Sequence, residues 1–220
     1  MRRMGVIFDM DGVLVDSYWP HFESWKRLAA SQGVEMTEAM FRTTFGRTSR
    51  EIIRHFWAGR VVSDEQVADW DRQKERAYRD ILMENFPEMD GAAELLAGLH
   101  AAGFSLGIGS SGPPENVSVI RRHLRNARFF KAQTTAADVT HGKPHPEVFL
   151  VAAGKLGLPP RHCLVVEDAP AGVTAGKTAG MAVIAITGTV TGDKLAHADH
   201  VVDSLRDITP ALVKSLIART

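Results

Sequence analysis

Short apolar segments recur along the chain, and a helical pattern follows most of them. The apolar runs are GVIF at residues 5–8, FSLGIG at 104–109, CLVVE at 163–167, AVIAI at 182–186 and a shorter HVV at 200–202. Continuous runs of this length are typical of strands buried on both faces of a parallel sheet. The helical patterns are DGAAELLAGLHAAG at 90–103, PPENVSVIRRHL at 113–124, HPEVFLVAAGKLG at 145–157 and PAGVTAGKTAG at 170–180. This alternation predicts an open α/β sheet covered by helices.

One region, from about Tyr18 to Phe86, breaks the alternation because it contains only helical patterns and no convincing strand. Within it, Phe22, Trp25, Leu28 and Ala29 recur at the spacing of one apolar helix face. A helical block between the first strand and the next strand–helix unit predicts an inserted domain. We therefore assign residues 1–16 and 88–220 to the α/β core and residues 17–87 to a helical insert.

Composition excludes several classes of partner and location. Lys plus Arg number 26 and Asp plus Glu number 26, so the neutral chain offers no electrostatic attraction for nucleic acid or an anionic membrane. The single cysteine, Cys163, lies in a predicted strand, where a buried, inert thiol is expected. The sequence shows no transmembrane run and no signal-peptide pattern, which predicts a soluble cytoplasmic protein.

Polar side chains follow the predicted strands at their carboxyl ends. These ends share one edge of a parallel sheet, and ligands bind beyond that edge. Two acidic pairs, a lysine and a hydroxyl group converging there would form a site for a divalent cation and an anion, and oxygen ligands favour Mg²⁺. The candidate residues are Asp9, Asp11, Ser110, Ser111, Lys143, Glu167 and Asp168.

Four short motifs occur in order along the chain: FDMDGVLVDS, GIGSS, GKPHPE and VVEDAPAG. Together they resemble the four motifs of the haloacid dehalogenase superfamily, and the resemblance covers the predicted core almost end to end. It implies a Rossmann-like three-layer core with a parallel sheet. The helical insert is similar to the small α-helical cap of the branch that contains sugar-phosphate phosphatases and β-phosphoglucomutase.

This resemblance assigns roles to the acidic residues. Asp9 would be the nucleophile that takes the phosphoryl group as an aspartyl-phosphate. Asp11 would be the general acid–base, and its backbone carbonyl would also ligate Mg²⁺. The spacing of two places both side chains on one face of an extended segment, and Gly12 permits the turn that follows. Asp168 would complete the metal shell, whereas Glu167 would ligate through water or only orient the site.

The remaining motif residues would bind phosphate. Lys143 would keep Asp9 ionised together with Mg²⁺ and shield the approaching phosphate. Ser110 follows its strand directly, and we prefer it over the adjacent Ser111 for the phosphate contact. The alternative for either serine is to cap the next helix. Asp90 before Gly91 replaces the family's usual Pro-Gly, so the hinge is expected to differ.

The cap would close over the site and bind the part of the substrate that determines specificity. His21 matches a histidine of β-phosphoglucomutase that contacts the acid–base aspartate, and Arg50 in GRTSRE matches an arginine that grips a second phosphate. Lys74 is a further candidate, although it could equally be one charge on a solvated helix. His141 and His145 show no metal-ligand spacing and are interpreted as surface groups.

The resemblance therefore implies a Mg²⁺-dependent phosphatase of a small sugar or polyol phosphate. The alternative is a β-phosphoglucomutase-like isomerase, which returns the phosphoryl group to a sugar hydroxyl. A non-catalytic binding protein ranks below both. The expected partner is a small phosphate ester, not nucleic acid or membrane, and the expected state is a monomer or weak dimer.

Overall fold

The computed structural model describes residues 3–44, 48–59 and 63–220. The chain divides into two compact units. The sheet unit comprises Met1–Asp16 and Pro87–Thr220, and the helical unit comprises Ser17–Phe86. Each unit has its own cluster of buried apolar side chains, so each is described by itself.

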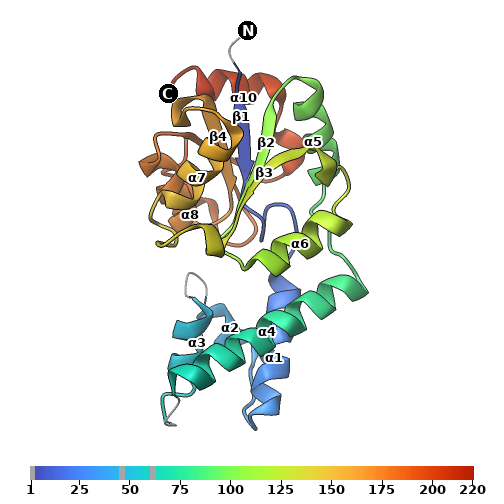
Figure 1. The fold of residues 1–220 in the computed structure, drawn as a ribbon, viewed down its shortest axis with the longest axis vertical. Helices are drawn as coiled ribbons and strands as arrows, with labels where there is room; N and C mark the ends of the chain where they lie inside the picture. Colours follow the sequence, from blue (N-terminus) through green and yellow to red (C-terminus); the bar gives the residue numbers. More distant parts are fainter. Residues whose placement is uncertain (1–2, 45–47, 60–62) are drawn as a thin grey trace. The chain divides into compact units, whose positions relative to one another are not determined.

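The sheet unit contains a six-stranded parallel sheet with the order β3-β2-β1-β4-β5-β6. Figure 1 shows β1 beside β2, with helices around the sheet. β1, β2, β4 and β5 are fully buried, which confirms the interpretation of their apolar runs. The strands are β1 Gly5–Phe8, β2 Ser105–Gly109, β3 Phe130–Thr134, β4 Cys163–Glu167, β5 Ala182–Ile186 and β6 His200–Val202.

The sequence analysis missed β3, which pairs with β2 at one edge of the sheet. Its sequence, FKAQT, alternates buried and more exposed side chains, with Lys131 exposed. An edge strand need not be apolar on both faces, so a search for continuous apolar runs passes over it. The five-strand expectation was therefore one strand short.

Helices cover both faces of this sheet, as the α/β pattern predicted. α7 packs on β1, β2 and β3, and α8 packs on β4 and β5. Ile7, Val165 and Val183 belong to the apolar cluster that includes Phe149 of α7 and Val173 of α8. α5 packs on β2 and α10 on β4. The helices are α5 Ala92–Ala101, α6 Pro114–His123, α7 Glu147–Leu156, α8 Pro170–Thr178, α9 Gly192–Leu195 and α10 Pro210–Ile217, with short 3-10 helices η1 Ala127–Phe129, η2 Ala136–Asp138, η3 Pro160–His162 and η4 Leu205–Asp207.

Cys163 begins β4 with its thiol buried and free. Burial raises the pKa of this thiol to about 12. The thiolate is therefore disfavoured near neutral pH, and the interpretation of a buried strand thiol is confirmed.

Asp90 and Gly91 open α5 in an unusual way. Gly91 adopts φ +83° at the N-cap, a left-handed conformation that favours glycine. Asp90 accepts two hydrogen bonds from Arg206, from Nε at 2.8 Å and from Nη2 at 2.6 Å. An Arg–carboxylate ion pair with two hydrogen bonds therefore lies beside this turn.

The helical unit consists of α1 Tyr18–Ser31, α2 Glu38–Arg42, α3 Ser49–Phe56 and α4 Asp64–Glu84. Phe22, Trp25, Leu28 and Ala29 are all buried on α1, as their spacing predicted. Capping boxes begin α3 at Thr48 and α4 at Ser63, where the side chains satisfy backbone N–H groups that lack helical partners. Among the described residues, no helix has the length and apolarity needed to cross a membrane.

Candidate active site

Asp9 stands at the carboxyl end of β1, between β2 and β4. Its backbone N–H donates to the Val166 carbonyl at 2.9 Å, which continues the ladder and fixes the start of the turn. The residue is 8% exposed. Its Oδ1 accepts a hydrogen bond from Lys143 Nζ at 2.5 Å. The end of the buried strand β1 thus carries a carboxylate, that of Asp9, which is paired with the ammonium group of Lys143.

Lys143 reaches this position from the loop before α7. Its Nζ also donates to Glu167 Oε1 at 2.6 Å. Asp9 and Glu167 come from the neighbouring strands β1 and β4, so the lysine bridges the two strand ends. This contact between residues 134 positions apart brings together the first, third and fourth sequence motifs.

Glu167 is almost fully buried and its carboxylate is fully engaged. Oε2 accepts from the backbone N–H groups of Asp168 at 2.7 Å and Ala169 at 2.8 Å, while Oε1 faces Lys143. A Cβ added at Gly172 would overlap this carboxylate, so α8 needs a glycine there. The contacts hold Glu167 in one position and make it a support for Lys143.

Asp168 is buried beside Glu167, and its Oδ2 accepts a short hydrogen bond from Thr189 Oγ1. Gly12 lies against both groups at φ +73°, and an added Cβ would meet the Asp168 carboxylate and Thr189 Oγ1. The glycine thus serves the turn, as predicted, and also the close approach. Sequence reasoning missed Thr189, although its place just after β5 is a signal that the strand-end rule could have used.

The electrostatics of the site are dominated by burial of like charges. Burial, opposed by Lys143 and reinforced by Glu167, raises the pKa of Asp9 from 3.8 to about 7. Burial and the neighbouring carboxylates Glu167 and Asp9 raise the pKa of Asp168 well above its usual value. Asp9 and Glu167 raise the pKa of Lys143 against the opposing effect of burial. Three carboxylates face one ammonium group, so a further cation would relieve the excess negative charge.

The donor set at this point fits a metal ion. Oxygens of Asp9, Glu167 and Asp168 lie within 4.8 Å of one another. All three donors are carboxylates, which suits a hard cation such as Mg²⁺ better than an imidazole- or thiolate-preferring metal. Because Glu167 already accepts three hydrogen bonds, Asp9 and Asp168 are the better-placed direct ligands.

Asp11 is half-buried in the turn that follows β1. Gly12 N–H donates to the Val15 carbonyl at 2.9 Å, and Asp11 forms an isolated bridge with Val15. These backbone contacts hold the turn closed. The charge of Asp11 contributes to the raised pKa of Asp9, so the two carboxylates lie close enough to interact.

The two serines after β2 differ in their surroundings. Ser110 is 1% exposed, and its Oγ accepts from the Gly112 backbone N–H at 3.0 Å. Ser111 is exposed. Sequence reasoning missed Asn116, a buried amide in the first turn of α6; a Cβ added at Gly112 would lie 3.2 Å from Ser110 Oγ and 4.0 Å from Asn116 Nδ2. Ser110 and Asn116 are therefore two buried polar groups that flank one glycine.

The predicted residues of the helical unit fall into two groups. Lys74 is 3% exposed, and its Nζ lies 2.9 Å from His21 Nδ1 and 2.8 Å from Glu75 Oε1. Tyr78 stacks on the His21 ring, with centroids 4.1 Å apart. The alternative reading of Lys74 as a solvated helix charge was therefore wrong. Arg50 lies exposed on α3, and Gly46 and Arg47 of its motif lie outside the described residues.

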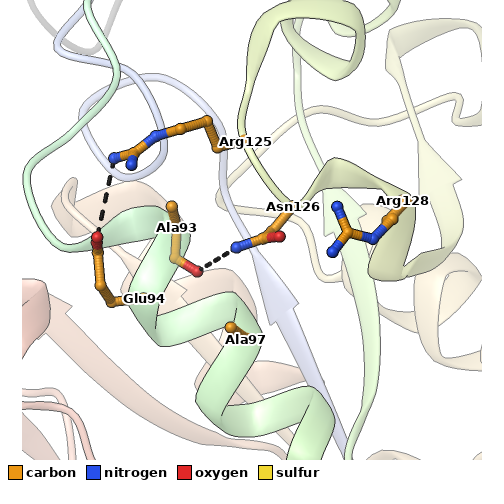
Figure 2. Close-up of a pocket in the computed structure, with 6 residues that line it drawn as sticks. All are labelled: Ala93, Glu94, Ala97, Arg125, Asn126 and Arg128. Carbon is orange, nitrogen blue, oxygen red and sulfur yellow. Dashed lines mark hydrogen bonds and ion pairs between the residues drawn. The ribbon is translucent and has the colours of Figure 1, made fainter.

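A surface pocket of about 400 Å³ lies elsewhere on the sheet unit. Its lining residues are Ala93, Glu94, Ala97, Arg125, Asn126 and Arg128. Figure 2 shows Arg125 paired with Glu94, and Asn126 donating to the Ala93 carbonyl. Arg125 also pairs with Glu88 at 2.7 Å. Its charge is thus compensated, and the pocket contains none of the residues predicted for the active site.

Comparisons with known proteins agree with this geometry. The family model described as haloacid dehalogenase-like hydrolase matches residues 4–180. The chain is 35% identical over 209 residues to hexitol phosphatase A of Escherichia coli (strain K12), covering 95% of this chain and 94% of the relative. It is 30% identical over 214 residues to β-phosphoglucomutase of Bacillus subtilis (strain 168), covering 94% and 92%.

A solved structure extends the comparison to the fold. A family IA, variant 3 hydrolase of Entamoeba histolytica HM-1:IMSS superposes with a TM-score of 0.89 at 28% identity, covering 98% of this chain and 99% of the other. The match spans both the sheet unit and the helical unit. With the four motifs meeting at one edge of the sheet, the chain belongs to the haloacid dehalogenase-like hydrolases.

Proposed function

We propose that this protein is a Mg²⁺-dependent phosphatase that acts on a small sugar or polyol phosphate through a phosphorylated Asp9. The observation that carries the proposal is the Asp9 carboxylate. It is buried at the end of β1, 2.5 Å from Lys143 Nζ, and its oxygens lie within 4.8 Å of those of Glu167 and Asp168. A paired, water-poor carboxylate at a strand end is suited to nucleophilic attack on phosphorus.

In the first step, an Asp9 carboxylate oxygen forms a bond to phosphorus and the bond from phosphorus to the ester oxygen breaks. Asp11 gives its proton to that leaving oxygen. In the second step, water attacks the phosphorus of the aspartyl-phosphate and Asp11 takes a proton from that water. Inorganic phosphate leaves, and the Asp9 carboxylate is restored.

The phosphoryl oxygens need donors that do not themselves react. Lys143 uses two of its N–H bonds on Asp9 and Glu167, and the third can donate to a phosphoryl oxygen. Ser110 Oγ accepts from Gly112, which leaves its own O–H to donate. Asn116 adds a buried amide near the same glycine, Gly112. Fixed donors of this kind stabilise charge that develops on the transferring group.

Asp9, Asp168 and the Asp11 backbone carbonyl would hold Mg²⁺, with Glu167 acting through Lys143 and backbone N–H groups. When bound, the ion offsets the repulsion between the Asp9 carboxylate and the phosphate dianion. The excess of buried carboxylates over ammonium groups is the property of this chain that supports the assignment.

The substrate class rests on the relatives and on the helical unit. Several relatives are named as phosphatases of phosphorylated carbohydrates or polyols, including the hexitol phosphatase A at 35% identity and a phosphorylated carbohydrates phosphatase of Thermotoga maritima at 31%. We assign substrate recognition to His21, Arg50 and Lys74 of the helical unit. Neutral overall charge fits a small-molecule substrate.

A second candidate function is a phosphosugar mutase. The observation that favours it is the contact between the buried Lys74 and the half-buried His21, whose ring stacks on Tyr78. Such an ordered polar cluster can bind sugar hydroxyls and direct the phosphoryl group back to one of them. Phosphatases and β-phosphoglucomutases both stand among the relatives, so the fate of the phosphoryl group must be measured.

The experiment supplies Mg²⁺ and a panel of sugar and polyol phosphates, and follows free phosphate and sugar isomers together. The panel includes β-glucose 1-phosphate with a trace of the 1,6-bisphosphate. We expect rapid phosphate release from a sugar or polyol phosphate, and loss of at least about 10³-fold in Asp9→Asn because the nucleophile is removed. Asp80→Asn, at an exposed position on α4, is the matched control and should keep wild-type activity.

Four outcomes separate the candidates. Phosphate release without isomer formation supports the phosphatase. Conversion to glucose 6-phosphate with little free phosphate establishes the mutase in its place. Full activity in Asp9→Asn would overturn the nucleophile assignment, and absence of turnover across the panel would favour a non-catalytic binding protein.

A further inference from the structure

A second cluster of metal-ligating side chains lies outside the acidic site. His141 and His145 flank Lys143 in the loop before α7, and Glu147 begins that helix. One donor atom from each of the three lies within 4.8 Å of the other two. The sequence interpretation of the two histidines as surface groups without a metal-binding arrangement was therefore incomplete.

A turn in the loop produces this convergence. His145 N–H donates to the Gly142 carbonyl at 3.0 Å, which folds the segment back on itself. The two imidazole rings then lie with centroids 4.6 Å apart. A spacing of four residues outside a helix does not predict a metal site. The turn closed by His145 and Gly142 is what brings the ring nitrogens together.

The distances suit one ion of the size and geometry of Zn²⁺. His141 Nδ1 lies 3.0 Å from Glu147 Oε2, and His145 Nδ1 lies 3.8 Å from the same oxygen. Donors about 2.05 Å from a tetrahedral Zn²⁺ stand about 3.3 Å from one another. The two observed distances lie on either side of that value, and one donor atom from each of the three residues lies within 4.8 Å of the others.

The carboxylate of this cluster is held in place before any ion arrives. Glu147 accepts from the backbone N–H groups of Thr140 at 3.0 Å and His141 at 2.9 Å. These hydrogen bonds lower the pKa of Glu147, so the side chain is ionised at neutral pH. A fixed anionic oxygen beside two imidazoles reduces the ordering that binding would otherwise require.

Both imidazoles can change partner on metal binding. Their side chains are 63% and 51% exposed for His141 and His145, so an ion can enter from solvent. His141 Nδ1 lies 3.0 Å from Glu147 Oε2, and in the tautomer that carries its proton on Nε2 this Nδ1 can ligate an ion. His145 Nδ1 accepts only a 3.3 Å hydrogen bond from the Glu147 N–H, which an ion can replace.

We propose that His141, His145 and Glu147 form a binding site for one Zn²⁺-class ion, separate from the all-carboxylate site of Asp9, Glu167 and Asp168. Two imidazoles and one carboxylate are donors that favour Zn²⁺, Ni²⁺ or Cu²⁺, whereas the all-oxygen site favours Mg²⁺. Three protein ligands leave the fourth tetrahedral position to water. The chain thus carries two metal sites of different chemical hardness.

The site bears on catalysis through its position. The ion would join residues on both sides of Lys143, whose ammonium group contacts Asp9 and Glu167. Fixing both ends of this five-residue segment restricts the movement of Lys143. An effect of Zn²⁺ on turnover that disappears in His141→Ala would report this coupling, but the binding itself is tested without reference to activity.

The test titrates the full-length protein with Zn²⁺ by isothermal calorimetry in excess Mg²⁺, which competes for the all-carboxylate site. We expect one Zn²⁺ per chain. His141→Ala and His145→Ala should each weaken binding at least about 10-fold, because one of three ligands is lost. His55→Ala removes an exposed imidazole from α3 in the helical unit and is the matched control, with unchanged affinity expected.

A second measurement identifies the ligands independently of affinity. Co²⁺ in place of Zn²⁺ should give the visible absorption of a four-coordinate ion in the wild type, and His145→Ala should reduce it. Equal Zn²⁺ affinity in wild type and in both histidine variants would overturn the proposal. So would loss of the bound Zn²⁺ in Asp168→Asn but not in His141→Ala, because the ion would then occupy the acidic site.

Discussion

At the scale of single residues, the proposed chemistry depends on how three neighbouring carboxylates share one lysine. Lys143 touches Asp9 and Glu167, while Asp168 turns to Thr189. Because their hydrogen-bond partners differ, we expect the three carboxylates to have different roles. Glu167 is the most completely engaged, whereas burial and the neighbouring carboxylates raise the pKa of Asp9 and of Asp168.

The raised pKa of Asp9, about 7, predicts that Mg²⁺ binding is linked to proton release. A carboxyl group with a pKa raised by folding stabilises the metal-free fold at low pH, and this contribution is lost as pH rises from 3.8 through about 7. Mg²⁺ binds the ionised form. The rise in melting temperature caused by Mg²⁺ should therefore grow between about pH 5.5 and about pH 8.5.

Differential scanning fluorimetry with Mg²⁺, and with NaCl at equal ionic strength as the control, measures this linkage. A Mg²⁺-induced shift that stays constant over the same pH range would show that Asp9 and Asp168 do not bind the ion in competition with protons.

A second prediction separates the two acidic residues after β4. Glu167→Gln removes the charge that pairs with Lys143 but leaves Asp168 in place, so turnover should fall while Mg²⁺ affinity changes little. Asp168→Asn should weaken Mg²⁺ binding by about 10-fold or more. Calorimetric Mg²⁺ titration and kcat measured on the same two variants decide the assignment, and equal loss of Mg²⁺ affinity in both would make Glu167 a direct ligand.

At the scale of elements, the helices that pack beside the strands help to position the side chains at the strand ends. α8 illustrates this, because Gly172 lies against the Glu167 carboxylate and a larger residue there would displace it. Gly154 on α7 is also helical, but an added Cβ there meets nothing within 4 Å. The two helical glycines thus differ in what an added Cβ would meet.

Gly172→Ala should therefore destabilise the protein by roughly 2 kcal/mol or more, because the displaced Glu167 loses hydrogen bonds to buried groups. Gly154→Ala should be neutral or stabilising by up to about 1 kcal/mol, since alanine is the better helix former. Chemical denaturation of both variants tests the contrast. Equal stability of the two variants would show that close packing at Gly172 does not hold Glu167.

The elements also show how far the sequence could predict this fold. The strands β1, β2, β4 and β5 could be predicted because their apolar runs are typical of strands buried on both faces. The rule that ligands bind at the carboxyl ends of parallel strands then predicted that Asp9, Ser110 and Asp168 lie at one edge of the sheet. The strand β3 was not predicted because it lies at the edge of the sheet and carries polar residues such as Lys131. Thr189 and Asn116 were missed because neither lies in one of the four motifs. The position of Thr189 after β5 was a usable signal, whereas the proximity of Asn116 to Ser110 follows only from the fold.

At the scale of the whole molecule, the chain places its chemistry and its predicted substrate recognition in units with separate apolar clusters. Ile53 is fully buried in the cluster of the helical unit. Ile53→Ala should cost roughly 2–4 kcal/mol of stability, as expected for a buried large-to-small change.

The same variant should keep the stabilisation produced by Mg²⁺, because Asp9 and Asp168 belong to the other unit. Calorimetric unfolding with and without Mg²⁺ measures both effects at once. A Mg²⁺-induced shift that vanishes in Ile53→Ala would mean that metal binding depends on the packing of the helical unit.

The measurement that tests the central claim most directly is chemical trapping of the phosphorylated residue. The enzyme is mixed with Mg²⁺ and its best substrate, quenched during turnover and reduced with borohydride, which converts an aspartyl-phosphate to homoserine. Peptide mass spectrometry then locates the modification. We predict homoserine at position 9, and its absence in Asp9→Asn. Modification of Asp11 or Asp168, or turnover without any trapped residue at position 9, would contradict Asp9 as the nucleophile.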